Sequence, residues 1–289
     1  MTKIAYQFGG QGAIVDPIPS KLKRIVTSAT FLLGAFMLTQ LIVQLYIYTF
    51  TTLLGYETQF GYHWVVAKPF AWDMWGNVRV VMIYAMPPII CLVLAYITQF
   101  VFINYSSVAT RSKLFFLWMQ TCLINLLLTQ LFILPVGSKG GLTGFYQTFS
   151  IVATWFRVEG VYFLPATILA AVLAVLWGIF IAPQLQTFSF SARLIQTKSG
   201  KDAMSRQVFV FPLLLASPFI ILFSNQYSFF VHVISVALMG LIYVGVIIRH
   251  RTDASVVMCS KEDFLNALNW KEIVAVIALW TVIIVFFNR

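Results

Sequence analysis

Charged side chains are scarce in this chain of 289 residues. Only 10% of the residues are Asp, Glu, Lys or Arg, against about 25% in a typical soluble domain, while 60% are hydrophobic. The mean hydropathy is +0.89. These values exclude an ordinary water-soluble domain and predict a polytopic integral membrane protein. We expect an all-α transmembrane helix bundle that forms a single integral membrane domain over residues 1–289.

Acidic residues, cysteines and histidines are few as well. The nine acids fall in tails, links or span ends, whereas ion-coupled transporters usually place an acid at mid-membrane. The three cysteines and three histidines are scattered, without the spacing of a metal, redox or disulfide site. We therefore expect no catalytic cluster, no metal and no cofactor, and the chain is predicted not to be an enzyme.

Seven apolar runs approach or exceed the roughly 20 residues that a membrane span needs. A cytoplasmic tail, residues 1–24, is expected to lack regular structure because it holds three glycines, Pro17 and Pro19. Pro87 and Pro88 should kink the second span, and Pro183 should end the fourth. A short interfacial hairpin is expected after the first span, which stops at Gly55, and an interfacial or re-entrant helix at 142–160. The predicted spans are 26–54, 78–102, 114–135, 161–181, 208–223, 229–248 and 273–287.

Basic residues divide unevenly when the chain is threaded through these seven spans. Fourteen of the 19 Lys and Arg residues fall on one side, mostly in the tail and in the links 184–207 and 249–270. The positive-inside rule then places the N-terminus in the cytoplasm and the C-terminus outside. A bacterial inner (cytoplasmic) membrane fits best, although organelle membranes obey related rules. Nucleic acid is not needed to explain the net charge of +10.

Uncharged polar residues inside the spans are the main candidate site residues, because amides in lipid must find partners. They either fasten helices together or face a partner or a shared wet cavity. His232 is the only histidine at depth, and its simplest role is a neutral side chain bonded to a neighbouring helix. An ion pair is expected between Arg157 and Glu159. The partner-facing or cavity-facing candidates are Gln40, Gln44, Gln99, Gln120, Asn125, Gln130 and His232; the interfacial candidates are His63, Trp64, Asp73, Arg157 and Glu159.

Two stretches resemble the intramembrane site-2 metalloproteases. In that family a membrane helix carries His-Glu-x-x-His, ends about six residues later in a Leu-Leu-Gly stop, and is followed by a β-like segment. Here residues 43–47, Val-Gln-Leu-Tyr-Ile, precede Leu53-Leu54-Gly55 by six residues, and YETQFGYHWVV follows. Residues 134–141, LPVGSKGG, stand where the family's proline and Asp-Gly turn would be.

Each position that the family's chemistry needs is replaced in this chain. Val43 and Ile47 stand at the two histidine positions, Gln44 at the general base, and Lys139 at the liganding aspartate. Such a set holds no zinc and activates no water. The resemblance therefore implies a pseudoprotease-like fold whose cleft binds a partner helix or strand without cutting it.

The sequence thus favours a non-catalytic structural or partner-binding subunit of a membrane protein complex, with the lipid bilayer and other membrane subunits as partners. Gln44, Gln120 and Gln130 are expected to line the contact with a partner helix. The alternative is a transporter or permease subunit for a small solute, in which the proline-kinked second and fifth spans move. A lipid enzyme is a third reading, with only Asp73, His63 and Glu159 at headgroup depth.

Overall fold

The computed structural model describes residues 18–61, 64–68, 76–104, 111–137, 148–189, 196–222, 229–252 and 269–287. Helices dominate these segments, and one two-stranded hairpin follows the first helix. The strands are β1 (Glu57–Gly61) and β2 (Trp64–Lys68). The helices are α1 (Ile18–Leu53), α2 (Asn77–Tyr84), α3 (Met86–Asn104), α4 (Arg111–Gly137), α5 (Thr148–Trp155), η2 (Gly160–Phe163), α6 (Leu164–Gln186), α8 (Lys198–Ser205), the π-helix η3 (Arg206–Val210), α9 (Phe211–Leu222), α10 (Phe229–Thr252) and α11 (Trp270–Phe287).

Within the described segments, six helical stretches are long and apolar enough to cross a membrane, which indicates a multi-pass membrane protein. Their outer faces are apolar too, with Leu92, Val93 and Ile97 of α3 and Leu169 and Leu176 of α6 among the exposed side chains. Large exposed apolar surfaces are rare on proteins that face water, whereas lipid favours them. The stretches are Lys21–Leu53, Asn77–Asn104, Arg111–Gly137, Gly160–Gln186, Lys198–Leu222 and Phe229–Thr252. The seventh predicted span coincides with α11, which is helical but is not among these six.

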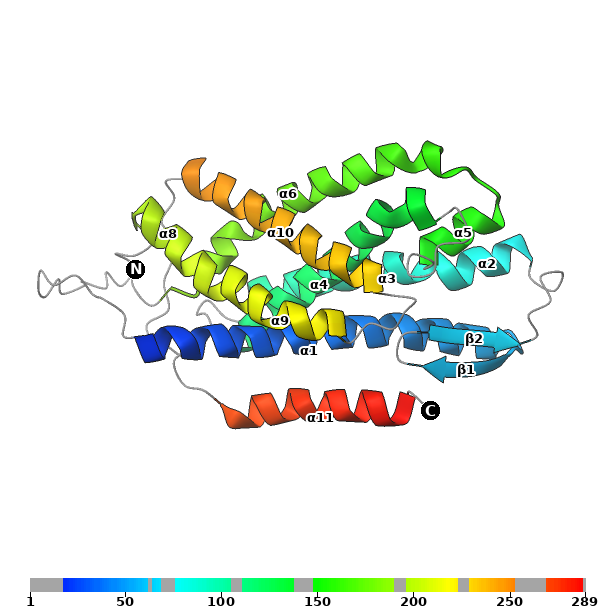
Figure 1. Cartoon of the computed structure of the whole chain (residues 1–289), viewed down its shortest axis with the longest axis horizontal. Coiled ribbons are helices and arrows are strands. Elements are labelled where there is room, and N and C mark those ends of the chain that lie inside the picture. Colours follow the sequence, from blue (N-terminus) through cyan, green and yellow to red (C-terminus); the bar gives the residue numbers. More distant parts are fainter. Residues whose placement is uncertain are drawn as a thin grey trace, which may run out of the picture.

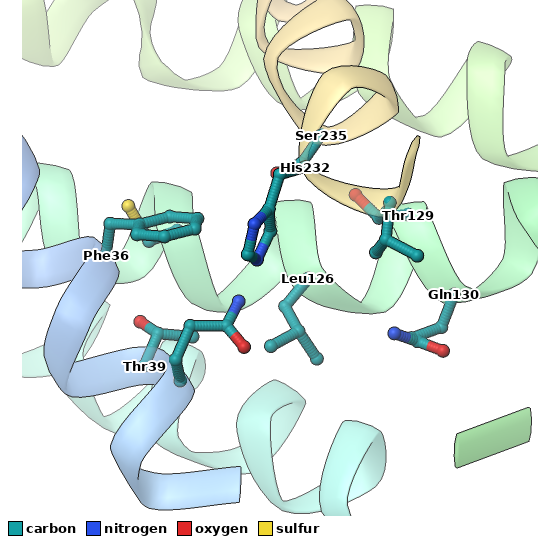
Figure 2. A pocket seen from close by; sticks show the side chains of 10 residues that line it. Phe36, Thr39, Leu126, Thr129, Gln130, His232 and Ser235 are labelled. Atoms are coloured by element: carbon teal, nitrogen blue, oxygen red, sulfur yellow. The ribbon is translucent and has the colours of Figure 1, made fainter. Parts of the chain in front are cut away.

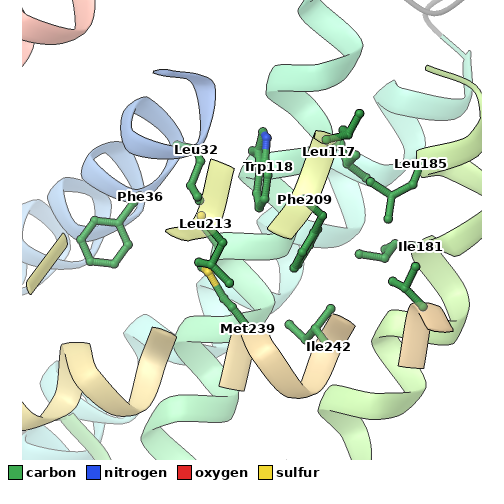
Figure 3. Packing of buried hydrophobic residues seen from close by; sticks show 14 of the residues in the cluster. Leu32, Phe36, Leu117, Trp118, Ile181, Leu185, Phe209, Leu213, Met239 and Ile242 are labelled. Carbon is green, nitrogen blue, oxygen red and sulfur yellow. The ribbon is translucent and has the colours of Figure 1, made fainter. Parts of the chain in front are cut away.

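The bundle is built around α1 and α4 (Figure 1). Helix α1 runs along the whole molecule, with α11 on one side of it and the other helices on the other side. Met37 of α1 packs against Val276, Leu279 and Trp280 of α11. Trp118 of α4 lies at the centre of the main core (Figure 3). It is fully buried, stacks on Phe209 of η3 with ring centroids 4.9 Å apart, and donates a hydrogen bond to Ser28 Oγ of α1 at 2.9 Å.

The backbones of α6 and α10 approach each other closely at two glycines. Gly178 of α6 lies against the backbone of Ile242 in α10, and Gly245 of α10 lies against the backbone of Val175 in α6. A Cβ atom added to either glycine would overlap a backbone carbonyl oxygen of the other helix. Small residues at such crossings let two membrane helices approach closely enough for extensive van der Waals contact.

The predicted stop at Gly55 and the predicted hairpin are both present. Gly55 has a left-handed φ of 83°, the conformation that commonly ends a helix, and Tyr56 N donates to Thr51 O at 3.2 Å. The chain then enters β1, which pairs antiparallel with β2 from Glu57↔Lys68 to Gly61↔Trp64. The hairpin lies beside the end of α1, at the same end of the bundle as α2 and α5 (Figure 1).

Prolines affect the helices less than the sequence analysis expects. The second span does break at Ala85, between α2 and α3, next to Pro87 and Pro88. However, α1 begins at Ile18 and includes Pro19, because proline is tolerated in the first turn of a helix, where the backbone N–H has no helical partner. Helix α6 likewise continues through Pro183 to Gln186.

Two predicted links also differ from the structure. Residues 184–186 belong to α6, and 198–207 belong to α8 and η3, so much of the expected link 184–207 is helical. Residues 249–252 similarly extend α10, while 253–268 lie outside the described residues. Hydrogen bonding favours continued helix at a span end, even where the residues become polar. Within 142–160 the structure describes α5, whose buried residues are Thr148, Ser150 and Ala153.

Candidate functional site

A small polar cavity lies between α1, α4 and α10. It offers about 10 Å³ of space for the centre of a water molecule, which is room for about one water. The ring of His232 projects from α10 into the space between Phe36 of α1 and Leu126 of α4 (Figure 2), and lies edge-on to Phe36 with centroids 5.3 Å apart. The lining residues are Phe36, Thr39, Gln40, Cys122, Leu126, Thr129, Gln130, Val231, His232 and Ser235.

Three of the predicted candidates therefore meet at this cavity: Gln40, Gln130 and His232. Their side chains are neutral donors and acceptors, apart from the histidine, which can also take up a proton. The cavity can hold a single water molecule or a similarly small polar species in a bundle that is otherwise apolar. It is far smaller than the roughly 300–1,000 Å³ of common small-molecule pockets.

A chain of glutamines joins three helices. Gln120 Nε2 of α4 donates to Gln184 Oε1 of α6 at 2.7 Å, and Gln184 Nε2 donates to Gln99 Oε1 of α3 at 3.1 Å. Gln120 is fully buried, and its Oε1 has no hydrogen-bond partner among the described residues. Gln184 is the link that the sequence analysis missed, because it lies beyond Pro183, where the fourth span was expected to end.

The other two amides of α4 point to different helices. Asn125 Nδ2 donates to Ser235 Oγ of α10 at 2.6 Å, and Thr148 Oγ1 of α5 donates to Gln130 Oε1 at 2.7 Å. Helices α1 and α4 also pack together, but none of these bonds joins them. Gln120 and Gln130 are at most 2% exposed, so these two glutamines lie inside the bundle and not on an outer face that could contact a partner helix. Gln44 is half-buried.

The interfacial candidates are only partly described. Trp64 is the first residue of β2, whereas His63 and Asp73 lie outside the described residues. Arg157 and Glu159 are both exposed in the turn that leads into η2, where Arg157 has a left-handed φ of 53°. In this described turn no ion pair joins them, and water solvates both charges at little cost.

A buried serine and a buried histidine lie beside a partly exposed aspartate, an arrangement that the sequence does not predict. His250, near the end of α10, lies 3.2 Å (Nδ1) from Asp202 Oδ1 and 3.4 Å (Nε2) from Ser205 Oγ, both in α8. Ser205 and His250 are each 1% exposed, so a substrate would not reach the serine oxygen in this conformation. The arrangement acts as a polar link between α8 and α10. The i, i+3 spacing of Asp202 and Ser205 is visible in the sequence, but their proximity to His250 is not.

In the helix that resembles the metalloprotease family, the two histidine positions hold buried apolar side chains. Val43 and Ile47 are buried in a second apolar cluster with Ile83, Leu123 and Leu126. Lys139 lies outside the described residues, and Pro135 occupies the last turn of α4. Within the described segments, no three His, Cys, Asp or Glu side chains converge as a metal site would require.

Comparison with protein-family models, with curated proteins and with solved structures finds no match for this chain. The fold itself defines the class of the protein. It is a multi-pass helical membrane bundle with a packed core, a polar cavity with room for about one water molecule, and a hairpin at one end.

The glutamine chain predicts non-additive stability effects. Gln184→Leu should lower the free energy of unfolding by about 1–2 kcal/mol, because it leaves both Gln120 and Gln99 without the bonds described above. Replacing all three glutamines by leucine should cost less than that single change. Thermal unfolding in mild detergent measures this, with exposed Gln196→Leu as the neutral control. A triple variant that is destabilised by the sum of its single changes would contradict the prediction.

Proposed function

We propose that this protein is a non-catalytic structural or partner-binding subunit of a membrane protein complex, and that the hairpin at the end of α1 is the part that meets the partner. We place the chain in a cytoplasmic (inner) membrane, with the N-terminus inside and the hairpin outside. The observation that carries the proposal is the length of α1 together with the hairpin at its end.

Helix α1 is longer than a bilayer core requires. Its 36 residues extend about 54 Å at 1.5 Å per residue, against a hydrocarbon core of about 30 Å. This extra length supports a position in or beyond the headgroup layer for the last part of α1 and for the hairpin that follows it. Such a projection gives a membrane subunit a surface that other subunits can reach without entering the bilayer.

The hairpin is held firmly against α1 on one side. Phe60 meets Tyr48 edge-on with ring centroids 5.3 Å apart, and the hydroxyls of Thr52 and Thr58 lie 2.8 Å apart. Arg79 Nη1 of α2 donates to the hydroxyl of Tyr56 at 3.0 Å, just before β1. A fixed hairpin loses little conformational entropy when a partner binds.

The opposite face of β1 carries exposed side chains. Glu57 and Gln59 of β1 are exposed, and in the described part of the chain the sheet contains only β1 and β2. An edge strand offers unpaired backbone N–H and C=O groups, to which an extended segment of another chain can add. This use of the hairpin fits the resemblance to the site-2 metalloproteases: a pseudoprotease-like fold that holds a strand without cutting it.

The test compares co-purification of partners with the wild type and with Glu57→Arg/Gln59→Arg after gentle extraction from native membranes. Both positions are exposed, so the bundle should remain folded while the new positive charges and longer side chains obstruct the edge of β1. Partner recovery should fall at least about tenfold, the change that roughly 1.4 kcal/mol produces. Glu159→Arg, at an exposed position outside the hairpin, should recover partners normally. Equal partner recovery with the wild type and with both variants would contradict the proposal that the hairpin binds the partner.

A transporter or permease subunit for a small solute is the second candidate, because a polar cavity lies at the start of α10. His232, Gln40 and Gln130 line it, and the π-helix η3 next to the short α9 is a type of irregularity often found at functional sites. Solute flux into liposomes that contain the purified protein alone would favour this candidate over the first.

A further inference from the structure

Three helix ends that carry basic residues meet at the end of the bundle opposite the hairpin. They are the start of α1, α8 with η3, and the last turn of α10 (Figure 1). Arg24 Nη1 of α1 donates to Gln207 Oε1 of η3 at 3.2 Å, and His250 of α10 pairs with Asp202 of α8. Side chains distant in the sequence therefore share one surface, which we call the basic end.

Most of the charged side chains in the described part of the basic end are positive. Helix α1 contributes Lys21, Lys23 and Arg24, and α10 contributes Arg249 and Arg251. Lys198, Lys201 and Arg206 add three more from α8 and η3. Asp202 is the one acid in the described part of these helices, and it already pairs with His250. The described parts of these helices thus carry eight cations and one acid, and the exposed cations among them are Lys23, Lys198, Arg206 and Arg251, an arrangement that favours an anionic ligand.

Exposed apolar side chains continue directly from these charges along the same helices. On α9, after Arg206, Phe211 is 43% and Leu214 62% exposed; on α10, one turn before Arg251, Ile248 is 41% exposed. Helices α9 and α10 contact each other, and each of them carries exposed apolar residues within about two turns of a basic residue of the basic end. A ligand that matches both parts has an anionic head and a hydrocarbon tail.

We propose that the basic end binds an anionic phospholipid, with the phosphate held by exposed Arg206 and Arg251 and an acyl chain lying along Leu214 and Ile248. Arginine forms paired hydrogen bonds with phosphate oxygens, and basic clusters next to membrane helices attract anionic headgroups. A free phosphate would use only the arginines. A phospholipid uses the arginines and the apolar surface together, which is why we favour it.

The experiment measures the unfolding temperature of the full chain in mild detergent with added phosphatidylglycerol, phosphatidylcholine or glycerol phosphate. Phosphatidylglycerol should raise it by about 4 °C or more above phosphatidylcholine, because a ligand that binds the folded state stabilises it. Glycerol phosphate should give less than half of that rise. Equal effects of the two lipids would overturn the proposal, and an equal effect of glycerol phosphate would replace the lipid by a soluble phosphate anion.

Paired variants locate the site. Arg206→Gln/Arg251→Gln should lose more than half of the shift that phosphatidylglycerol produces, measured against the same variant in phosphatidylcholine. The control, Arg157→Gln, removes an exposed charge just after α5, at the opposite end of the bundle (Figure 1), and should keep the full shift. Native mass spectrometry with equimolar lipids should show the same order of phosphatidylglycerol retention. A full shift and full retention in the first variant would place the lipid elsewhere and overturn the assignment.

Discussion

Gly178→Ala is expected to destabilise the bundle by about 3 kcal/mol or more, near the upper end of overpacking effects. The added Cβ would overlap the carbonyl oxygen of Ile242 in α10, and a backbone atom cannot rotate away as a side chain does. Helices α6 and α10 would have to separate along their whole contact. Thermal unfolding in mild detergent should show a fall of about 8 °C or more in the midpoint.

The chain offers a control on the same crossing helix. Gly240 of α10 is half-buried, and a Cβ added there would meet no atom within 4 Å. Gly240→Ala should therefore be neutral or gain about 0.5–1 kcal/mol, since alanine favours helix over glycine. Gly245→Ala should behave like Gly178→Ala, because its Cβ would overlap the carbonyl oxygen of Val175. Equal stability of all three variants would contradict the close packing of α6 and α10.

Trp118→Ala is expected to cost about 3–5 kcal/mol, the range for removal of a buried aromatic ring. The indole is fully buried between Ser28 and Phe209, and Ser28 Oγ in turn donates to Val208 O at 2.7 Å. One side chain thus ties α1, α4 and η3 together. Its removal opens a cavity where those three elements meet.

Trp118→Phe separates packing from hydrogen bonding. It should keep most of the stacking on Phe209 and cost about 1 kcal/mol through loss of the bond to Ser28. Trp270→Ala, at a side chain that is 68% exposed, should change the free energy of unfolding by no more than about 0.5 kcal/mol. Chemical or thermal unfolding followed by tryptophan fluorescence measures all three. A Trp118→Ala variant as stable as Trp270→Ala would contradict the position assigned to the indole.

Composition was enough to predict the class of fold, because 60% hydrophobic residues leave few alternatives to a membrane bundle. The stop at Gly55, the hairpin and the break beside Pro87 also follow from local rules on glycine and proline. Helix boundaries were less predictable. Local rules predict that Pro19 and Pro183 break helices, yet both lie inside helices, since the first turn tolerates proline and tertiary packing maintains the last turn of α6.

The polar residues were predictable as a set but not in their pairing. The sequence shows that Gln99, Gln120, Asn125 and Gln130 must find partners in an apolar environment, but a sequence pattern does not say which helix each one faces. Three of them bond to α6, α10 and α5, and the fourth accepts from Gln184. The link between Asp202, Ser205 and His250 depends likewise on the packing of α8 against α10, which only the fold establishes.

The mass of the protein as it exists in native membranes tests the central claim most directly. The chain has a mass of 32.7 kDa, and native mass spectrometry after mild extraction should find it in a larger particle with other polypeptides at fixed stoichiometry. Those polypeptides should dissociate in the Glu57→Arg/Gln59→Arg variant. A particle that contains only copies of this chain, together with solute flux in liposomes, would contradict the subunit function and establish the transporter.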